Sequence, residues 1–299
     1  MTDAGATLGR VLFYDRQLSV NNRVACASCH VQQLGFGDTA RLSRGFAGGV
    51  TKRHSMALAN ARLYPNGRFF WDERAGTLEA QVLMPVQDPV EMGMTLPVLE
   101  TKLASVSYYG PLFKAAFGTP EITSDRMSRA LAQFVRSLVS SDAPFDRGPA
   151  ALNAQERDGQ RLFNGPAGCA RCHVGPALNS DGPHNTGLDA EIVDNGAGRG
   201  QFKAPSLRNV AVRAPYMHDG RFTTLMQVVE HYNNGVKNNP ALDQRLRGRG
   251  GGPARPLELS LAQREAIVAY MCTLTDSTFL VAPQFSNPFL PVRVVSQRK

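Results

Sequence analysis

Two copies of the pattern Cys-x-x-Cys-His constrain this chain of 299 residues more than any other feature. They read Cys-Ala-Ser-Cys-His at residues 26–30 and Cys-Ala-Arg-Cys-His at residues 169–173, and they use four of the five cysteines. In such a pattern each thiol can add to one vinyl group of a porphyrin, and the adjacent imidazole can then bind the iron. We therefore predict two covalently bound haem c groups, held by Cys26, Cys29, His30, Cys169, Cys172 and His173.

Other uses of paired cysteines fit the sequence less well. A structural zinc site usually places its two cysteine pairs close together, whereas these pairs lie in opposite halves of the chain. Disulfides or redox-active pairs would also use two nearby cysteines, but neither explains why a histidine follows each pair.

An internal repeat accompanies the two motifs. Leu-Gly-Arg-Val-Leu-Phe at residues 8–13 precedes the first motif, and Asp-Gly-Gln-Arg-Leu-Phe at residues 158–163 precedes the second. The 28 glycines and 19 prolines favour short helices joined by long loops, and strands are scarce. We predict a mostly α fold of two cytochrome c-like domains, each with one haem c, at residues 1–146 and 147–299.

Several helices can be placed from their ends and their periodicity. Residues 123–140 form an amphipathic pattern, Asn153 with Glu156 predicts a helix start, and residues 260–263 form a capping box that opens a helix through residue 274. This last helix carries the fifth cysteine, Cys272. Because core-type residues surround it, we expect a buried and inert thiol.

Composition and charge exclude other classes of protein. No stretch approaches the roughly 18 apolar residues of a membrane span. The formal charge is +8 at pH 7, and we expect part of the basic excess to pair with haem propionates and the rest to steer an acidic partner or small anions. Basic residues are not interleaved with aromatic ones, so we expect no nucleic acid partner.

The start of the chain bears on its compartment. Residues 1–6 lack the basic start and apolar run of a secretory signal. Because haem is attached to such motifs outside the bacterial inner membrane, we expect a periplasmic protein whose leader has been removed.

Five further motifs follow in order. They are Phe-Trp-Asp-Glu-Arg at 70–74, Leu-Glu-Ala-Gln at 78–81, Asp-Pro-Val-Glu-Met-Gly at 88–93, Phe-Lys-Ala-Pro-Ser-Leu-Arg-Asn-Val at 202–210 and Ala-Pro-Tyr-Met-His-Asp-Gly at 214–220. With these motifs the chain resembles the bacterial di-haem cytochrome c peroxidase and MauG family over nearly its whole length. The resemblance implies an enzyme whose first haem, on His30, reacts with hydrogen peroxide and whose second haem, on His173, transfers electrons.

The resemblance also assigns roles to single residues. Gln81, Pro85 and Glu91 match the pocket on the peroxide side of the first haem, where Glu91 would carry a proton from one peroxide oxygen to the other. Without the resemblance Glu91 would be an ordinary surface acid. Trp71, the only tryptophan, would lie between the haems and relay oxidising equivalents, although core packing also explains it.

Two departures from the peroxidase pattern indicate a subtype. In many of these peroxidases a histidine binds the iron of the first haem and blocks access to it, and the corresponding residue here is Phe46. Phenylalanine cannot bind iron. We therefore expect the first haem to have a free coordination position, unless His54 binds the iron instead. The sixth ligand of the second haem, commonly methionine, falls on Tyr232, as in MauG. A phenolate donor favours oxidised iron. The alternative ligands are Met226, Met217, His218 and His231.

The resemblance also implies a calcium site between the haems. The family site uses one side-chain oxygen and two backbone carbonyls, which map to His54, Arg213 and Pro215. Calcium prefers oxygen, so His54 weakens the predicted site.

These residues together predict a MauG-like oxidoreductase. Hydrogen peroxide would form a high-valent di-haem state that oxidises a residue of a partner protein, by analogy a tryptophan, through Trp71. The alternative is a cytochrome c peroxidase that reduces peroxide to water with electrons from a small cytochrome c or cupredoxin. A non-enzymatic di-haem electron carrier would need both irons fully ligated, and the set Gln81, Pro85 and Glu91 argues against it.

Overall fold

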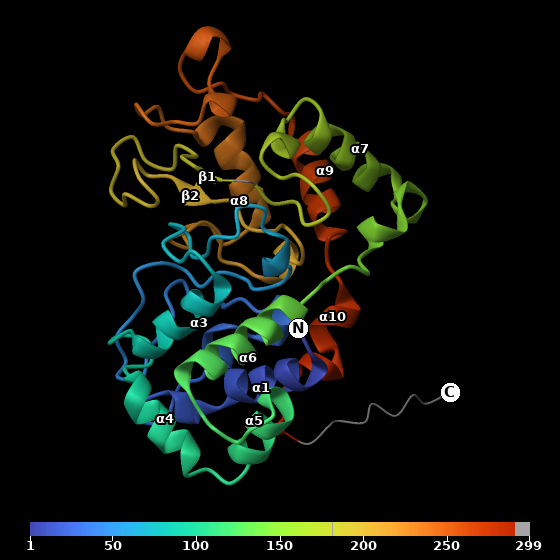
Figure 1. Ribbon diagram of the computed structural model, residues 1–299. Helices are drawn as coiled ribbons and strands as arrows, with labels where there is room; N and C mark the ends of the chain where they lie inside the picture. Colours follow the sequence, from blue (N-terminus) through green and yellow to red (C-terminus); the bar gives the residue numbers. More distant parts are fainter. Residues whose placement is uncertain (181, 291–299) are drawn as a thin grey trace.

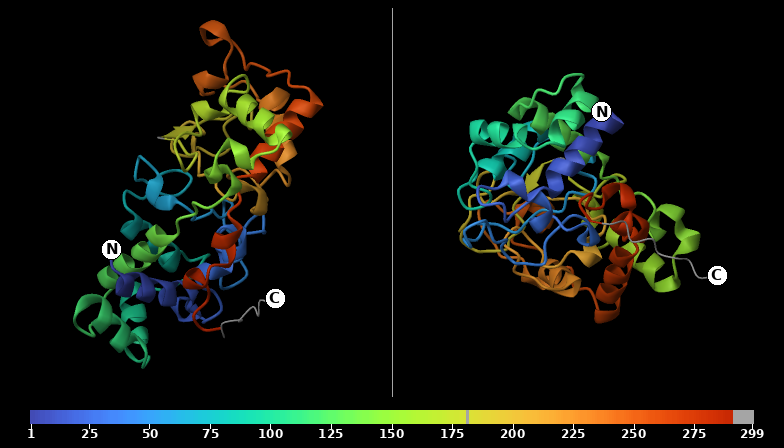
Figure 2. Two further views of the ribbon diagram at one scale, coloured as in Figure 1. Left: turned by 90° about the vertical axis from the view of Figure 1, so that its right-hand side faces the viewer. Right: turned by 90° about the horizontal axis from the view of Figure 1, so that it is seen from below.

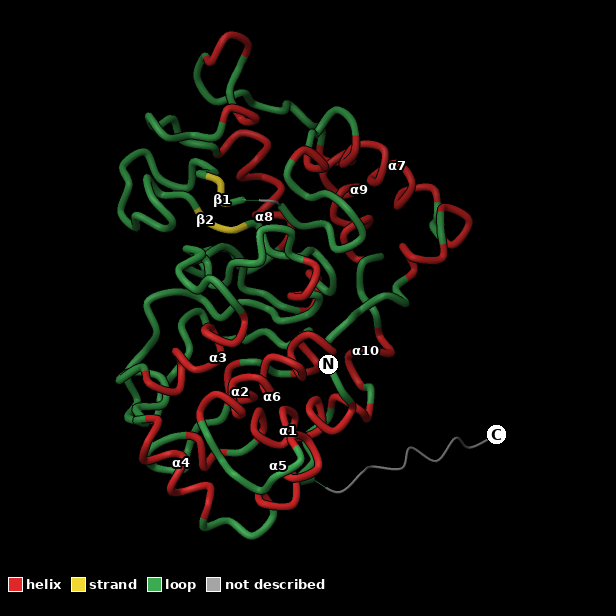
Figure 3. Tube along the Cα trace, viewed as in Figure 1, coloured by secondary structure: helices red, strands yellow, loops and turns green. Residues whose placement is uncertain are grey.

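A computed structural model describes residues 1–180 and 182–290 of the chain. Regular structure in this part is almost all helical, and long loops join the helices (Figure 3). The strands β1 (Pro183–His184) and β2 (Phe202–Lys203) form one short antiparallel sheet. The predicted mostly α character is confirmed. The α-helices are α1 (Asp3–Tyr14), α2 (Cys26–Cys29), α3 (Leu78–Gln87), α4 (Leu96–Ala104), α5 (Tyr109–Phe117), α6 (Ser124–Ser137), α7 (Ala154–Asn164), α8 (Leu225–Glu230), α9 (Leu261–Cys272) and α10 (Ser277–Val281).

Two hydrophobic cores lie in two units stacked end to end (Figures 1 and 2). In the first unit α1 packs on α6, with α3 and α5 beside them. In the second unit α7 packs on α9, which also contacts α8. Each unit therefore has one central helix pair, and in each unit the sequence repeat forms the first helix of the pair.

The repeat has an identical packing role in both units. A Cβ atom on Gly9 of α1 would lie 2.0 Å from the carbonyl oxygen of Ala130 in α6. A Cβ atom on Gly159 of α7 would lie 1.9 Å from the carbonyl oxygen of Ala266 in α9. Any side chain at either glycine would push the paired helices apart, because packed interiors have no room for an extra methyl group.

The helix ends follow the sequence signals. Thr123 caps α6, the reciprocal pair Asn153 and Glu156 caps α7, and Ser260 with Gln263 caps α9. In each case a side-chain oxygen accepts a hydrogen bond from a backbone N–H that the first helical turn leaves without a partner.

The expectation of a buried Cys272 is wrong, because its side chain is exposed. The buried face of α9 is formed by Ala266, Ile267, Tyr270 and Met271, and Leu274 extends it beyond the helix end. Residue 272 falls outside this stripe, because successive residues of a helix point about 100° apart. Apolar neighbours in sequence therefore do not bury it.

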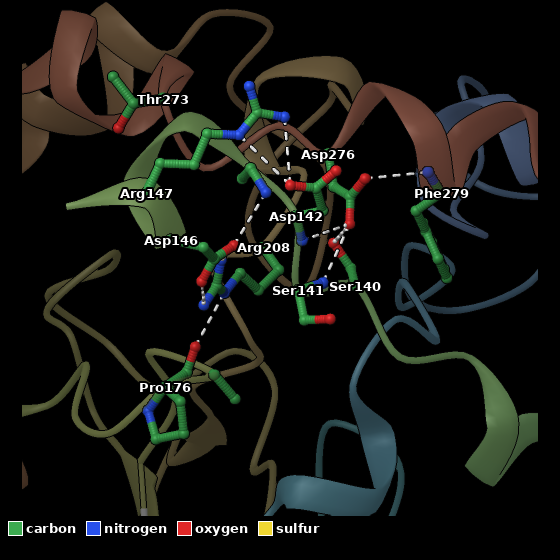
Figure 4. Close-up of polar contacts among 12 residues, drawn as sticks. Ser140, Ser141, Asp142, Asp146, Arg147, Pro176, Arg208, Thr273, Asp276 and Phe279 are labelled. Atoms are coloured by element: carbon green, nitrogen blue, oxygen red, sulfur yellow. Dashed lines mark hydrogen bonds and ion pairs between the residues drawn. The ribbon is translucent and has the colours of Figure 1, made fainter. Parts of the chain in front are cut away.

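The two units are joined through residues 140–147 (Figure 4). The carboxylate of Asp276 accepts hydrogen bonds from the backbone N–H groups of Ser141 and Asp142 at 2.9 and 3.0 Å. Arg208 of the second unit holds Asp146 through two hydrogen bonds of 2.6 Å. Beyond residue 276 the chain returns to the first unit, where Phe279 of α10 enters the first core. The boundary after residue 146 stays a prediction.

Candidate haem sites

A cavity of about 820 Å³ lies beside the first motif. Cys29 and His30 line it, and so do Gln81, Pro85 and Glu91. A smaller cavity of about 60 Å³ is lined by the same residues and by Cys26. The structure thus brings the residues predicted to hold and to serve the first haem around one space.

His30 is oriented by its own loop. Its Nδ1 donates a hydrogen bond to the carbonyl oxygen of Phe36 at 3.0 Å, which places the ring proton on Nδ1 and leaves a lone pair on Nε2. Burial lowers the pKa of His30, so the ring is neutral near pH 7. A neutral imidazole held through Nδ1–H is the usual form of a histidine that ligates a metal.

The second motif repeats this arrangement beside a cavity of about 200 Å³, which Cys169, Cys172, His173 and Tyr232 line. His173 Nδ1 donates to the carbonyl oxygen of Leu178 at 3.1 Å, and burial lowers the pKa of His173 to about 4. The phenylalanine of the sequence repeat packs near the motif histidine in both units. The ring centroids are 6.4 Å apart for Phe13 and His30 and 6.2 Å apart for Phe163 and His173.

The four motif cysteines are unpaired. Burial raises the pKa of Cys26 and of Cys169 to about 12 and that of Cys29 to about 11. Redox-active cysteines have lowered pKa values, so these thiols do not fit a redox pair. They fit covalent attachment to a group that fills the cavity.

The helix α3 positions two of the pocket residues. Thr77 caps it, and Gln81 and Pro85 stand one turn apart on the face toward the cavity. Because proline has no N–H, the carbonyl of residue 81 lacks its partner within the helix.

Glu91 lies in a tight turn after α3. The side chain of Asp88 accepts hydrogen bonds from the N–H groups of Val90 at 2.7 Å and Glu91 at 3.1 Å, which shapes this turn. Burial raises the pKa of Glu91, and the negative charge of Asp88 raises it further, whereas Arg74 opposes the shift. Glu91 is therefore a carboxylate whose proton affinity exceeds that of a surface acid.

Phe46 and His54, the two residues considered for the free coordination position of the first haem, differ in whether they line a cavity. The ring of Phe46 packs against Gly93, and Phe46 is outside the set of described residues that line the cavities beside His30. His54 lines both large cavities, but its Nδ1 donates to the carbonyl oxygen of Ala40 at 3.1 Å.

Trp71 lies at the border of the two large cavities, which it lines together with His54, Lys203 and Pro205. Its indole Nε1–H donates to the carbonyl oxygen of His54 at 2.7 Å. Its own carbonyl oxygen accepts from the N–H of Lys203 at 2.8 Å. The ring is thus fixed between the spaces beside the two motifs.

Tyr232 belongs to a short π-helical turn (His231–Gly235) that continues α8. Its hydroxyl bonds to the side chain of Thr186, and burial raises its pKa above the usual value. Among the alternative ligands, Met217 and His218 also line the second cavity, whereas Met226 and His231 are outside its described lining. His218 stacks on Phe202 with ring centroids 3.6 Å apart.

The residues predicted for calcium are a poor donor set. His54, Arg213 and Pro215 do come together at the second cavity. The side chain of His54 offers no oxygen, and its Nδ1–H points at a backbone carbonyl. Within residues 1–180 and 182–290, no group of three or more His, Cys, Asp or Glu side chains could hold a metal ion. The site does not fit calcium.

Sequence reasoning missed the roles of two cations near Trp71, the partly buried Arg53 and the buried Lys203. Arg53 binds Asp72 at 2.6 Å and Asp194 at 2.7 Å, and so joins the two units. The Nζ of Lys203 lies 3.4 Å from the centroid of the Tyr64 ring, and burial lowers its pKa to about 7. No local signal could reveal either cation, because their partners lie far away in sequence.

Comparisons with known proteins agree with this geometry. Residues 3–153 match the family model for di-haem cytochrome c peroxidase, and residues 156–275 match that for cytochrome c. The methylamine utilization protein MauG of Methylorubrum extorquens is 37% identical over 95% of this chain and 82% of its own length. The cytochrome c551 peroxidase of Nitrosomonas europaea is 33% identical over 96% of this chain and 83% of its own length.

Solved structures give the same result. The crystal structure of a MauG-like protein associated with microbial copper homeostasis is 30% identical, covers 97% of this chain and 94% of its own, and superposes with a TM-score of 0.85. The predicted pair of cytochrome c-like domains is thereby confirmed. None of the helices in the described part of the chain has the length and apolar character needed to span a membrane.

Proposed function

The chain belongs to the di-haem cytochrome c peroxidase and MauG family and is an oxidoreductase with haem c cofactors, and from this premise we propose that it uses hydrogen peroxide to oxidise a residue of a partner protein. A tryptophan is the residue type we propose for the partner. The two cavities beside the motifs, both lined by Trp71, support this function most directly.

The residues around each cavity suit a covalently held haem. Three would hold the first haem, namely Cys26, Cys29 and His30. Four would hold the second, namely Cys169, Cys172, His173 and Tyr232. When bound, haem supplies the exchange of electrons with peroxide and with the partner.

Glu91 performs the proton transfer in this proposal. Its carboxylate takes a proton from one peroxide oxygen and gives it to the other, which leaves as water. The raised pKa favours both halves of this task, because the group accepts a proton readily and still ionises. Gln81 and Pro85 line the same cavity, where the amide can orient peroxide and the ring limits space for water.

Trp71 and Tyr232 determine where the oxidising equivalents go. The indole of Trp71 lies at the border of both cavities and provides an aromatic relay between them. A phenolate from Tyr232 would stabilise the oxidised form of the second haem. Such a haem stores oxidising equivalents better than it accepts electrons, which favours protein oxidation.

A conventional peroxidase is the second candidate, supported by the similarity to the cytochrome c551 peroxidase. It would draw electrons from a small cytochrome c or cupredoxin. In either case we propose a periplasmic enzyme, because covalent haem attachment takes place there. The proposed enzyme uses no calcium, because the donors at His54, Arg213 and Pro215 do not fit it.

Turnover with a donor separates the two candidates. The haem-loaded protein is mixed with peroxide and either reduced cytochrome c or a tryptophan-containing protein substrate. We expect slow oxidation of the cytochrome and oxidation of tryptophan, detected by mass spectrometry. Rapid, sustained cytochrome oxidation with unmodified tryptophan would instead assign the chain to the conventional peroxidases.

A further inference from the structure

Arg213 places a positive charge where the family resemblance puts calcium. Its Nε has no contact with solvent and no hydrogen-bond partner among the described residues, while another guanidinium nitrogen donates to the carbonyl oxygen of Ser206. None of the ion pairs within residues 1–180 and 182–290 includes Arg213. A buried guanidinium without a carboxylate is costly, so its environment is incomplete without a bound group.

The surroundings indicate which group completes it. Arg213 lines the second cavity together with His54 and the motif residue His173. An arginine pairs best with a carboxylate, which it can hold through two parallel hydrogen bonds. A haem in this cavity brings two propionate carboxylates.

The same charge excludes a divalent cation. An arginine is always protonated in proteins, and like charges repel strongly where water is absent. A calcium ion held by the backbone carbonyls of Arg213 and Pro215 would lie beside this guanidinium, and the side chain of His54, which lines the same cavity, offers no oxygen.

We propose that the guanidinium of Arg213 replaces calcium as the positive charge between the two haems and pairs with a propionate of the haem in the second cavity. This inference rests on the proposed function only in assuming that both haems are bound. It assigns Arg213 a positioning and electrostatic role, so the chain needs no calcium to reach its working state.

Calcium content and reduction potential test the proposal in the haem-loaded full chain. The protein is equilibrated with calcium chloride, desalted and analysed for metal, and the potential of the second haem is measured with and without a chelator. We expect the protein to retain no calcium, and we expect the chelator to leave the potential of the second haem unchanged. One calcium per chain, removed by chelator with a change in the haem spectrum, would overturn the proposal.

Three variants test the charge itself. Arg213→Thr removes it, and we expect the potential of the second haem to fall, because the reduced form loses a stabilising positive charge. Arg213→Lys keeps the charge and should keep most of the potential. Arg171→Thr removes an exposed arginine that also lines this cavity, and solvent screening should make its effect small.

The results distinguish a failure of the Arg213 proposal from a failure of the proposed function. Equal potentials in Arg213→Thr and Arg171→Thr would contradict the assigned role of Arg213. If Arg213→Thr does not fold, the calcium content of the wild type still decides, because one retained calcium per chain would overturn the proposal. A protein that does not react with peroxide would refute the proposed function, but it would leave the calcium content and the haem potentials as valid readings.

Discussion

Trp71 donates its indole N–H to the backbone carbonyl oxygen of His54 across 2.7 Å, and this bond fixes the ring at the border between the two haem cavities. The next residue, Asp72, binds Arg53, which also binds Asp194 of the second unit. The position of the indole is therefore set by contacts with both halves of the chain.

Trp71→Phe should uncouple the two haems. Phenylalanine fills most of the space but is much harder to oxidise and cannot donate to His54. We expect the first haem to react with peroxide as before, and transfer to the second haem to slow by about tenfold or more, or about 1.4 kcal/mol of barrier. Stopped-flow spectra of both haems measure this. Unchanged kinetics at the second haem would remove Trp71 from the pathway.

Glu91→Gln should slow the reaction with peroxide by roughly 10²–10⁴-fold, the usual contribution of a general acid–base group. In the wild type, the rate should rise with pH through the pKa of Glu91, which lies above the usual glutamate value. In Glu91→Gln the rate should not rise with pH in this range. A rate profile over pH with peroxide as the only reactant measures both effects.

Two further acidic residues test the role of Glu91, one by shifting its pKa and one as a control. Asp88→Asn removes the like charge but keeps an oxygen for the N–H groups of the turn, so the acid limb should move to lower pH. Glu79→Gln changes an acid of α3 that pairs with Arg136 and is outside the described lining of the first cavity, and it should leave the peroxide rate unchanged. A loss of activity in Glu79→Gln would indicate a structural effect.

Tyr232→Phe should change the absorption and electron paramagnetic resonance spectra of the second haem, because it removes the proposed ligand oxygen. Tyr216→Phe is the matched control, since Tyr216 lines the same cavity but its hydroxyl donates to the carbonyl oxygen of Val210. It should cost only about 1 kcal/mol of stability for one lost hydrogen bond. Identical spectra in the Tyr232 variant would shift the assignment to Met217 or His218.

Gly9→Ala and Gly159→Ala should each destabilise one unit. The added methyl group would meet the carbonyl oxygen of Ala130 or Ala266 in the paired helix, and overpacking of this kind costs about 1–3 kcal/mol. Gly76→Ala is the control, because a Cβ atom there would meet nothing within 4 Å. Denaturant unfolding of the haem-loaded proteins measures the difference, and equal stability of all three variants would refute the close-packing account.

The sequence was sufficient for features that depend on local pattern. The caps at Asn153 and Ser260 were predictable because a helix start needs a side-chain acceptor within three residues. The grouping of each motif beside a cavity was predictable, because the chemistry of haem attachment places two thiols and an imidazole within five positions, and the role of these residues in holding haem stays a prediction.

Features that depend on contacts between distant residues were not predictable. The bonds of Arg53 to Asp194 and of Arg208 to Asp146 join residues that only the folded chain brings together. The exposure of Cys272 depended on which stripe of α9 faces the core, and its apolar neighbours gave the wrong answer. The Nε of Arg213, which has no hydrogen-bond partner among the described residues, is likewise visible only in three dimensions.

The most direct test of the account adds one equivalent of hydrogen peroxide to the resting, haem-loaded protein without any donor and follows the optical spectrum. The account predicts an open, high-spin first haem at rest, followed by a change in the absorption of both haems that persists for minutes. Two fully ligated low-spin haems, or a spectrum that peroxide does not change, would contradict it.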